Sequence, residues 1–224
     1  MEERFARNIP AITAREQALL GQKRVLIVGC GGLGGYLCEL LTRLGVGHLR
    51  AVDEDVFDPS NQNRQLLCTS DTLGQSKAEA AKQRALAIAP GVDFESFSLR
   101  LTAENARALL EGCDAAVDGL DNVESRLVLE QACAELGIPL IHGAVSGWAA
   151  QVAVVPPGSG LLTLLYTQAE PAPSPAVLPF TAALCAAVQA TEATKLLCQR
   201  DVTLWGKLWL YDGLSGENHV VELI

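Results

Sequence analysis

The sequence predicts an α/β fold in which an open, mostly parallel sheet ends in an antiparallel extension. Three observations favour this fold class. Short apolar runs alternate with helix-like segments, a glycine cluster directly follows the first run, and two short runs lie close together at the end of the chain. Continuous apolar runs of about four to eight residues are typical of strands buried on both faces. In such sheets, ligands bind at the carboxyl ends of the strands.

The first part of the chain alternates regularly between strand and helix. The run "KRVLIV" predicts the first strand, and leucines at helical spacing predict a helix directly after the glycines. Pro90 ends an alanine-rich helix, and Thr102 is suited to cap the next helix. Strands are therefore expected at residues 23–28, 49–53, 92–99 and 114–121, and helices at 33–44, 76–90, 102–112 and 124–137.

The second part continues the sheet and then changes character. Strands are expected at 138–145 and 148–157, followed by loop segments rich in Pro, Gly, Ser and Ala. A long helix at 181–199 carries few charges, so we expect it to be buried against the sheet or a second subunit. The last two runs, 207–213 and 219–224, predict a closing antiparallel hairpin. Because no repeat and no clean boundary interrupt the chain, a single domain over residues 1–224 is expected.

Composition and charge exclude several classes of protein. The chain has 224 residues, 49% of them hydrophobic, and a formal net charge of −9. An acidic chain does not suit general binding to nucleic acid or to anionic membranes. The N-terminus lacks the apolar core of a signal peptide, and no run approaches membrane-spanning length, so a cytoplasmic protein is expected. The seven cysteines form no C-x-x-C pair, so we expect reduced thiols and no zinc.

The glycine cluster after the first strand predicts a phosphate-binding turn in a Rossmann-like sheet. Small residues let backbone N–H groups approach a phosphate, and the helix that follows adds favourable partial charge. Asp53 comes about twenty residues later, where an acid can bind ribose hydroxyls. A tight turn with close helix packing is the structural alternative, and an NAD dehydrogenase is the functional one. The glycines concerned are Gly29, Gly31, Gly32 and Gly34.

A polar cluster after the second strand favours a triphosphate over NAD. Arg64 and Gln65 lie in a polar turn with Asn61, and Lys77 opens the next helix. Hydride transfer needs no such cluster, whereas two cations can neutralise a triphosphate. Asp121 ends a predicted strand, where it can hold Mg²⁺ against the phosphates.

With these motifs in place, the chain resembles the ubiquitin-activating-type adenylating enzymes, represented in bacteria by MoeB, ThiF and HesA. The resemblance covers most of the chain, and its motifs occur in a specific order. The matching pieces are "RFARN", "GCGGLGG", "VDEDVFDPSNQNRQ", "LGQSKAEAA", "LTAEN", "DGLDNVESR", "HGAVSGWAAQVAVV" and "QATEATKLL".

The resemblance implies an ATP-dependent adenylyltransferase. In that family, ATP and the C-terminal Gly-Gly carboxylate of a small ubiquitin-like or sulfur-carrier protein react to give an acyl-adenylate and pyrophosphate. The resemblance places Asp121 on Mg²⁺ and implies a homodimer in which Arg7 reaches the partner's ATP. Arg64, Lys77 and Asp121 are the other expected catalytic residues. The implied nucleotide site comprises Gly29, Gly31, Gly32, Gly34, Asp53, Asp55, Asn61, Arg64, Gln65, Lys77, Asp121 and Asn122.

The chain departs from the family pattern in its cysteines. Many members carry zinc-binding C-x-x-C pairs and a cysteine in the crossover loop that takes over the acyl group, but the stretch "AEPAPSPAVLPF" contains none. Cys185 falls within the predicted helix 181–199, where burial would make it unreactive, and Cys68 is the one thiol expected to be exposed. We therefore expect adenylation without a covalent thioester. A carboxylate is already a nucleophile at neutral pH, so no general base is required.

Other functions and residue roles remain open at this point. The substrate carboxylate could belong to a modified tRNA, as in the TcdA branch, or to a peptide, although an acidic chain suits RNA poorly. The chain could also be a nucleotide-binding partner protein that has lost catalysis. His142 is expected to pack beneath the site, and His48 and His219 to lie at the surface or an edge. The tryptophans are expected to serve packing, although an exposed one could help to bind a partner protein. Those tryptophans are Trp148, Trp205 and Trp209.

Overall fold

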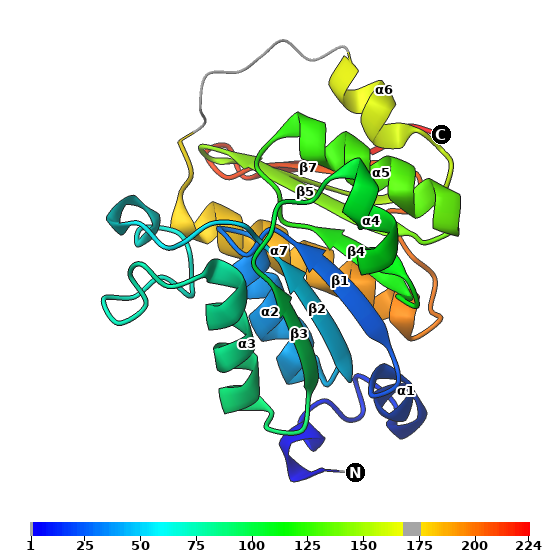
Figure 1. Cartoon of the computed structure of the whole chain (residues 1–224). Coiled ribbons are helices and arrows are strands. Elements are labelled where there is room, and N and C mark those ends of the chain that lie inside the picture. Colours follow the sequence, from blue (N-terminus) through cyan, green and yellow to red (C-terminus); the bar gives the residue numbers. More distant parts are fainter. Residues whose placement is uncertain (1, 168–175) are drawn as a thin grey trace.

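An eight-stranded sheet runs through the molecule in the order β3-β2-β1-β4-β5-β6-β7-β8 (Figure 1). The computed structural model describes residues 2–167 and 176–224. The strands are β1 (Arg24–Val28), β2 (His48–Val52), β3 (Asp93–Phe97), β4 (Ala115–Asp118), β5 (Leu140–Ser146), β6 (Ala149–Val155), β7 (Lys207–Asp212) and β8 (Glu217–Glu222).

Helices cover both faces of the parallel part of the sheet. Helices α2, α3 and α7 pack on one face, and α4, α5 and α6 pack on the other (Figure 1). The α-helices are α1 (Ala14–Leu20), α2 (Gly34–Leu44), α3 (Lys77–Ile88), α4 (Ala103–Leu110), α5 (Val123–Leu136), α6 (Leu161–Thr167) and α7 (Pro179–Leu197). Two 3₁₀ turns are η1 (Glu3–Phe5) and η2 (Pro59–Asn61).

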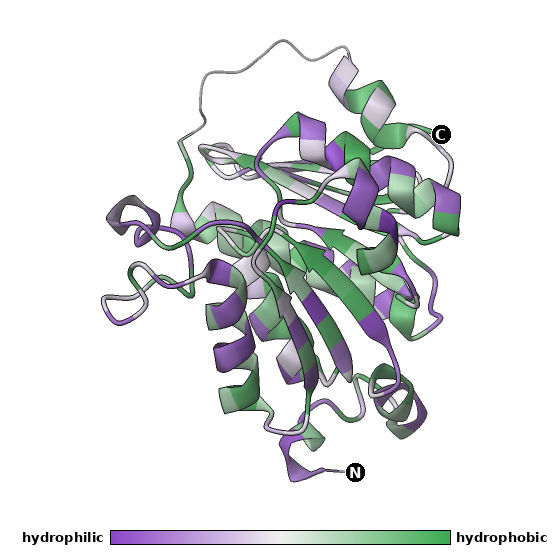
Figure 2. Cartoon of the chain, viewed as in Figure 1, coloured by the Kyte–Doolittle hydropathy of each residue, from purple (hydrophilic) through white to green (hydrophobic). Residues whose placement is uncertain are grey.

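Burial on both faces explains why β1 is continuously apolar from Val25 to Val28. In β1, Val25 and Ile27 belong to the core under α2, α3 and α7, while Leu26 and Val28 belong to the core under α4, α5 and α6. Figure 2 shows the same pattern, with hydrophobic residues concentrated in the central strands and hydrophilic residues on the outer sides of the helices. Each parallel strand therefore contributes side chains to two cores.

Strands β1 to β5 are parallel, and β6, β7 and β8 are antiparallel, which confirms the predicted fold class. The closing hairpin is confirmed with shifted bounds: β7 ends one residue earlier than predicted, at Asp212, and β8 begins and ends two residues earlier, at Glu217 and Glu222. The strand predicted to end at Asp121 ends at Asp118, because the backbone N–H of Leu120 turns back to donate to Asp118 Oδ1 at 2.8 Å. Helices α1 and α6 were not predicted.

Two further expectations about side chains were wrong. Cys68 is buried, with its Sγ 3.7 Å from the backbone oxygen of Asp58, so it is not an exposed thiol. Trp148 and Trp205 are 45% and 42% exposed, so they are not buried in the core. Trp209 packs against the core and stacks on Tyr211. Within residues 2–167 and 176–224, no helix is both long and apolar enough to cross a membrane.

Candidate active site

The glycine turn joins β1 to α2 at the point where the strand order changes direction. Gly29 adopts a left-handed φ of +87° and donates its N–H to the backbone oxygen of Val52. A Cβ on Gly34 would lie 1.7 Å from the oxygen of Gly29, and one on Gly29 would lie 2.6 Å from the oxygen of Gly119. Helix, strand and the neighbouring turn after β4 therefore approach each other more closely than any side chain would allow.

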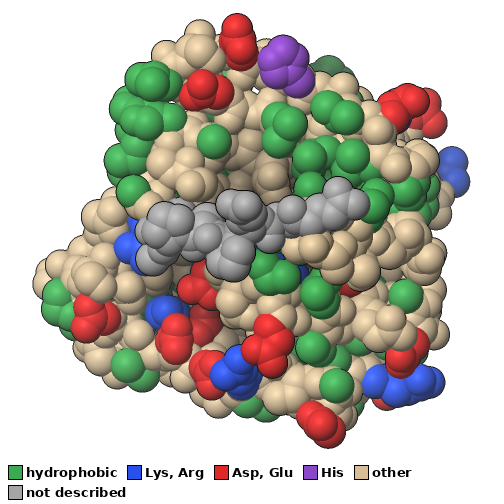
Figure 3. Space-filling view, turned by 90° about the horizontal axis from the view of Figure 1, so that it is seen from above, with side chains coloured by type: hydrophobic (Ala, Val, Ile, Leu, Met, Phe, Trp, Pro, Cys, Tyr) green, Lys and Arg blue, Asp and Glu red, His purple; other side chains and the backbone are tan. Residues whose placement is uncertain are grey.

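A cavity of about 310 Å³ opens above this turn. Its wall follows the carboxyl ends of β1, β2, β4 and β5, which is the expected ligand position in an open α/β sheet. Figure 3 looks onto this end of the molecule and shows acidic and basic side chains close together on it. The predicted site residues that line the cavity are Gly29, Gly31, Gly32, Asp53, Asp55, Arg64, Gln65, Lys77, Asp121 and Asn122.

Asp53 lies directly after β2 and is held by backbone donors. Its carboxylate accepts the N–H of Cys30 at 2.6 Å and the N–H of Asp55 at 2.9 Å. Burial raises the pKa of Asp53, and the two N–H donors oppose that shift. An acid fixed in this way beside the glycine turn is suited to accept hydrogen bonds from ribose hydroxyls.

The cations of the cavity differ in how they are held. The Lys77 side chain is 8% exposed, and its Nζ lies 2.8 Å from Oδ2 of Asp55, whose own side chain is 62% exposed. Arg64 is half-buried, and its Nη1 donates to the backbone oxygen of Ser60 and to the side chain of Asn63. Asp55 thus orients the lysine, while the arginine is anchored to its own turn.

Gln65 is buried beside Gly31, and its Oε1 accepts no hydrogen bond within the described part of the chain. A buried acceptor without a donor is costly, so a ligand that brings a donor would be stabilised there. Gln65 therefore fits a role in holding a polar ligand at the glycine turn.

Asp121 and Asn122 lie on the turn between β4 and α5. Asn122 caps α5 by accepting the N–H of Ser125 at 2.9 Å, and its Nδ2 lies 3.3 Å from Asp121 Oδ1. Both residues are exposed, so the Asp121 carboxylate is free to point into the cavity mouth. A carboxylate oxygen is the ligand type that Mg²⁺ prefers, so Asp121 would supply one ligand to a magnesium ion whose other ligands come from nucleotide and water; the described residues contain no cluster of three or more His, Cys, Asp or Glu side chains that would hold the ion alone.

Three predicted residues do not line the cavity. Gly34 lies beneath the turn, where its role is close packing. Asn61 accepts the N–H of Asp58 in the η2 turn and so shapes the loop that carries Arg64. Arg7 is exposed just after η1, where Phe5 packs near Gly45 at the amino end of the sheet. It is therefore at the opposite end of the strands from the cavity of its own chain.

The cavity also contains residues that the sequence analysis left without a role. Arg100 follows β3, and its Nη2 lies 3.6 Å from Glu124 across the cavity rim. Its position directly after a predicted strand was a usable signal. Arg126 belongs to the motif "DGLDNVESR", but the sequence did not reveal its partner Asp118. The remaining lining residues without a predicted role include Glu54, Leu99, Leu101, Gly119, Leu120, Ser125, Ala144, Val145 and Val177.

The predictions for the histidines and for Cys185 hold. His142 is fully buried beneath the cavity, whereas the side chain of His48 is 36% exposed and that of His219 is 67% exposed. Cys185 is fully buried on α7, and burial raises the pKa of its thiol to about 12. A thiol of this kind is a poor nucleophile at neutral pH.

Fold and cavity define the class of this protein as a Rossmann-like α/β protein with a cavity at the switch point of its sheet. The model of the ThiF family matches residues 5–223. The chain belongs to the ThiF family.

Curated relatives agree with this assignment. The SAMP-activating enzyme E1 of Haloferax volcanii is 34% identical, over 95% of this chain and 82% of that protein. The sulfur carrier protein adenylyltransferase of Thermus thermophilus is 35% identical, over 92% of this chain and 81% of that protein.

Solved structures share the fold at low sequence identity. E. coli MccB, crystallised with ATP, matches with a TM-score of 0.84 and 18% identity over 99% of this chain and 72% of that one. PaaA matches with a TM-score of 0.79 and 22% identity over 93% of this chain and 66% of that one.

Proposed function

We propose that the protein is an ATP-dependent adenylyltransferase that activates the C-terminal glycine carboxylate of a small ubiquitin-like or sulfur-carrier protein. The observation that carries the proposal is the gathering of Arg64, Lys77 and Asp121 with Asp53 around one glycine turn. Two cations suit a triphosphate, one acid suits its magnesium, and the other suits its ribose. A nicotinamide cofactor would not require Arg64, Lys77 and Asp121.

The reaction requires the protein to neutralise charge and to align the substrate carboxylate with the α-phosphorus of ATP. The substrate carboxylate attacks the α-phosphorus of ATP, and pyrophosphate leaves. Lys77 and Arg64 offset the repulsion between two anions, and the N–H groups of the glycine turn orient the phosphates. Asp121 would hold Mg²⁺, which supplies further neutralisation of phosphate charge when bound. Among the described residues that line the cavity there is no histidine or cysteine.

A protein substrate is supported by the names of the relatives and by an apolar surface beside the cavity. Trp148 and Phe180 are exposed, with ring centroids 5.0 Å apart. They flank the bridge between Gly147 and Val177, and Val177 lines the cavity. Exposed aromatic side chains are enriched where proteins bind partners. This surface favours a protein carrier over the modified tRNA or the free peptide.

A cytoplasmic location remains a prediction of the sequence.

ATP–pyrophosphate exchange tests the proposal. The protein should catalyse exchange only when a carrier protein ending in Gly-Gly and Mg²⁺ are both present, and a carrier that lacks its last glycine serves as the matched control. Calorimetry should show binding of Mg-ATP and little binding of NAD. Tight NAD binding without ATP binding would refute the proposal, and ATP binding without exchange by any carrier would favour the catalytically inactive partner.

We also propose a two-fold homodimer in which Arg7 serves the cavity of the partner subunit. The supporting observation is that Arg7 is exposed at the far end of the sheet from its own cavity. Mixing Arg7→Ala and Lys77→Ala subunits should restore exchange above that of either parent, because one site of the mixed dimer keeps both cations. Subunit exchange without recovery, or a fully active monomer in sedimentation, would contradict this arrangement.

A further inference from the structure

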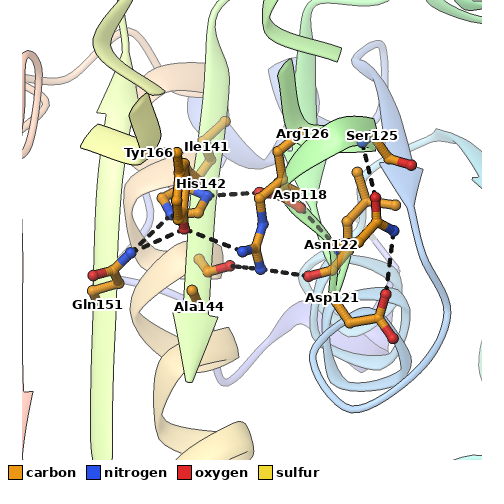
Figure 4. A network of polar contacts seen from close by, with 12 residues as sticks. Asp118, Asp121, Asn122, Ser125, Arg126, Ile141, His142, Ala144, Gln151 and Tyr166 are labelled. Atoms are coloured by element: carbon orange, nitrogen blue, oxygen red, sulfur yellow. Dashed lines mark hydrogen bonds and ion pairs between the residues drawn. The ribbon is translucent and has the colours of Figure 1, made fainter. Parts of the chain in front are cut away.

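A buried polar network lies directly behind the turn that carries Asp121 (Figure 4). Asp118, the last residue of β4, is fully buried, and so is His142 on β5. Arg126 on α5 is 7% exposed, and its Nε lies 3.2 Å from Asp118 Oδ2, within ion-pair distance. A buried pair of charges is expensive unless its geometry is favourable. The adenylation chemistry makes no direct use of the side chains of Asp118, Arg126 and His142.

The ion pair holds both backbone polar groups of Leu120. Asp118 Oδ1 accepts the Leu120 N–H at 2.8 Å, and Arg126 Nη2 donates to the Leu120 oxygen at 2.6 Å. Leu120 directly precedes Asp121, and Gly119 on its other side packs on the glycine turn. The backbone that presents the Asp121 carboxylate is therefore held on both sides. Within the described residues, the one hydrogen bond of the exposed carboxylate itself is the long contact to Asn122.

The network continues from the ion pair to α6. His142 Nδ1 lies 2.6 Å from Asp118 Oδ2, so this nitrogen carries the proton and Nε2 is an acceptor. The Tyr166 hydroxyl on α6 donates to His142 Nε2 at 3.0 Å and accepts from Arg126 Nη1 and from Gln151 Nε2, each at 3.1 Å. Burial lowers the pKa of His142, which favours the neutral ring, and the contact with Asp118 favours the tautomer protonated at Nδ1.

The hydrogen bonds of Arg126 decide between two roles for it. Arg126 lines the cavity and could be taken for a residue that binds the incoming carboxylate. However, Nη1 faces Tyr166, Nη2 donates to Leu120 and at 3.4 Å to the oxygen of Gly143, and Nε faces Asp118. Both Nη atoms donate to protein acceptors, while Nε is in ion-pair contact with Asp118 but makes no hydrogen bond in the described part of the chain. These contacts commit the two Nη atoms to holding the turn.

We propose that Arg126 and Tyr166 are positioning residues that fix the Asp121 turn for the magnesium ion of the bound nucleotide. The inference rests on the proposed ATP-dependent function. Outer residues that orient a metal ligand typically contribute about tenfold to a hundredfold to metal affinity. The effect should therefore appear in the magnesium dependence of nucleotide binding, not in nucleotide binding as a whole.

Calorimetric ATP titrations with Mg²⁺ and with EDTA test the inference in three variants. Arg126→Lys keeps the charge but cannot reach Leu120, Gly143 and Tyr166 together. In this variant we expect the increase in ATP affinity that Mg²⁺ produces to be at least about tenfold smaller than in the wild type. The ATP affinity in EDTA should stay within about twofold of the wild-type value. Tyr166→Phe should lose less, in the same direction. Tyr211→Phe is the matched control. Tyr211 lies on β7, outside the network, and its hydroxyl makes no hydrogen bond in the described part of the chain.

The outcomes separate this inference from the proposed function. An Arg126→Lys variant that folds and keeps the full magnesium increment would overturn the positioning role, as would equal losses with Mg²⁺ and with EDTA. If Arg126→Lys does not fold, Tyr166→Phe decides by the same criterion. A wild-type protein that binds no ATP, or binds it without any effect of Mg²⁺, would instead overturn the proposed function and this inference with it.

Discussion

Lys77→Ala is expected to lower carrier-dependent pyrophosphate exchange by at least about a hundredfold, because it removes a nearly buried cation from the phosphate side of the cavity. Asp121→Ala should cause a loss of similar size through the magnesium ion. Neither change should unfold the protein. The Asp55 carboxylate left behind by Lys77→Ala is largely exposed and can be hydrated, and Asp121 is itself exposed.

The measurement is isotope exchange at saturating ATP and carrier, with circular dichroism and thermal unfolding on the same samples. Lys82→Ala is the matched control, since Lys82 lies on the same helix, does not line the cavity and forms no ion pair in the described part of the chain. Exchange near the wild-type rate in both Lys77→Ala and Asp121→Ala, with the fold intact, would show that the proposed phosphate site is wrong.

Gly34→Ala is expected to destabilise the fold, whereas Gly32→Ala is expected to weaken nucleotide binding. A Cβ on Gly34 would lie 1.7 Å from the backbone oxygen of Gly29, so helix and strand would have to move apart. Alanine is preferred over glycine in helices by about 1 kcal/mol, but forced overpacking costs about 3 kcal/mol or more at a contact of this kind. We therefore expect Gly34→Ala to lower the free energy of unfolding by about 2 kcal/mol or more, which is the difference of those two effects.

Gly32→Ala should instead spare the fold and weaken nucleotide binding. The nearest atoms to its added Cβ are Arg64 Cγ at 3.9 Å and Ala182 Cβ at 4.0 Å, which are ordinary contacts. The methyl group would stand beside Arg64 in the space that a phosphate needs, so we expect a loss of at least about tenfold in ATP affinity. Denaturant unfolding and calorimetry on both variants separate the effects. An unstable Gly32→Ala with unchanged ATP affinity would contradict this division of roles.

Local signals in the sequence were sufficient for most of the fold. The apolar runs predicted four of the five parallel strands, because a strand buried on both faces is mostly apolar, and the alternation of "VDFESFSL" predicted β3. One local signal was overlooked. Thr13 and Glu16 form a capping box at the start of α1, and that pattern is visible in the sequence.

Other features had no local signal. Helix α6 depends on Glu130 of α5, whose carboxylate accepts the N–H groups of Leu162 and Thr163 at 2.6 and 3.0 Å. The end of β4 likewise depends on how Asp118 is paired. Contacts between residues distant in sequence leave no periodic pattern, so neither feature could be predicted from the chain itself.

The sequence by itself determined the fold class, the family and the identities of ten residues that line the cavity, because each depends on residue type and spacing. Only the tertiary structure decided which position and which contacts each of these residues has. It placed Gly34 under the turn and Gly32 beside the open space, turned Asp55 toward Lys77, and put Arg7 at the far end of the sheet. It also joined Asp118 to Arg126, His142 and Tyr166 across three elements. Such roles depend on distances of a few ångströms between segments far apart in the chain, and packing of the whole domain sets those distances.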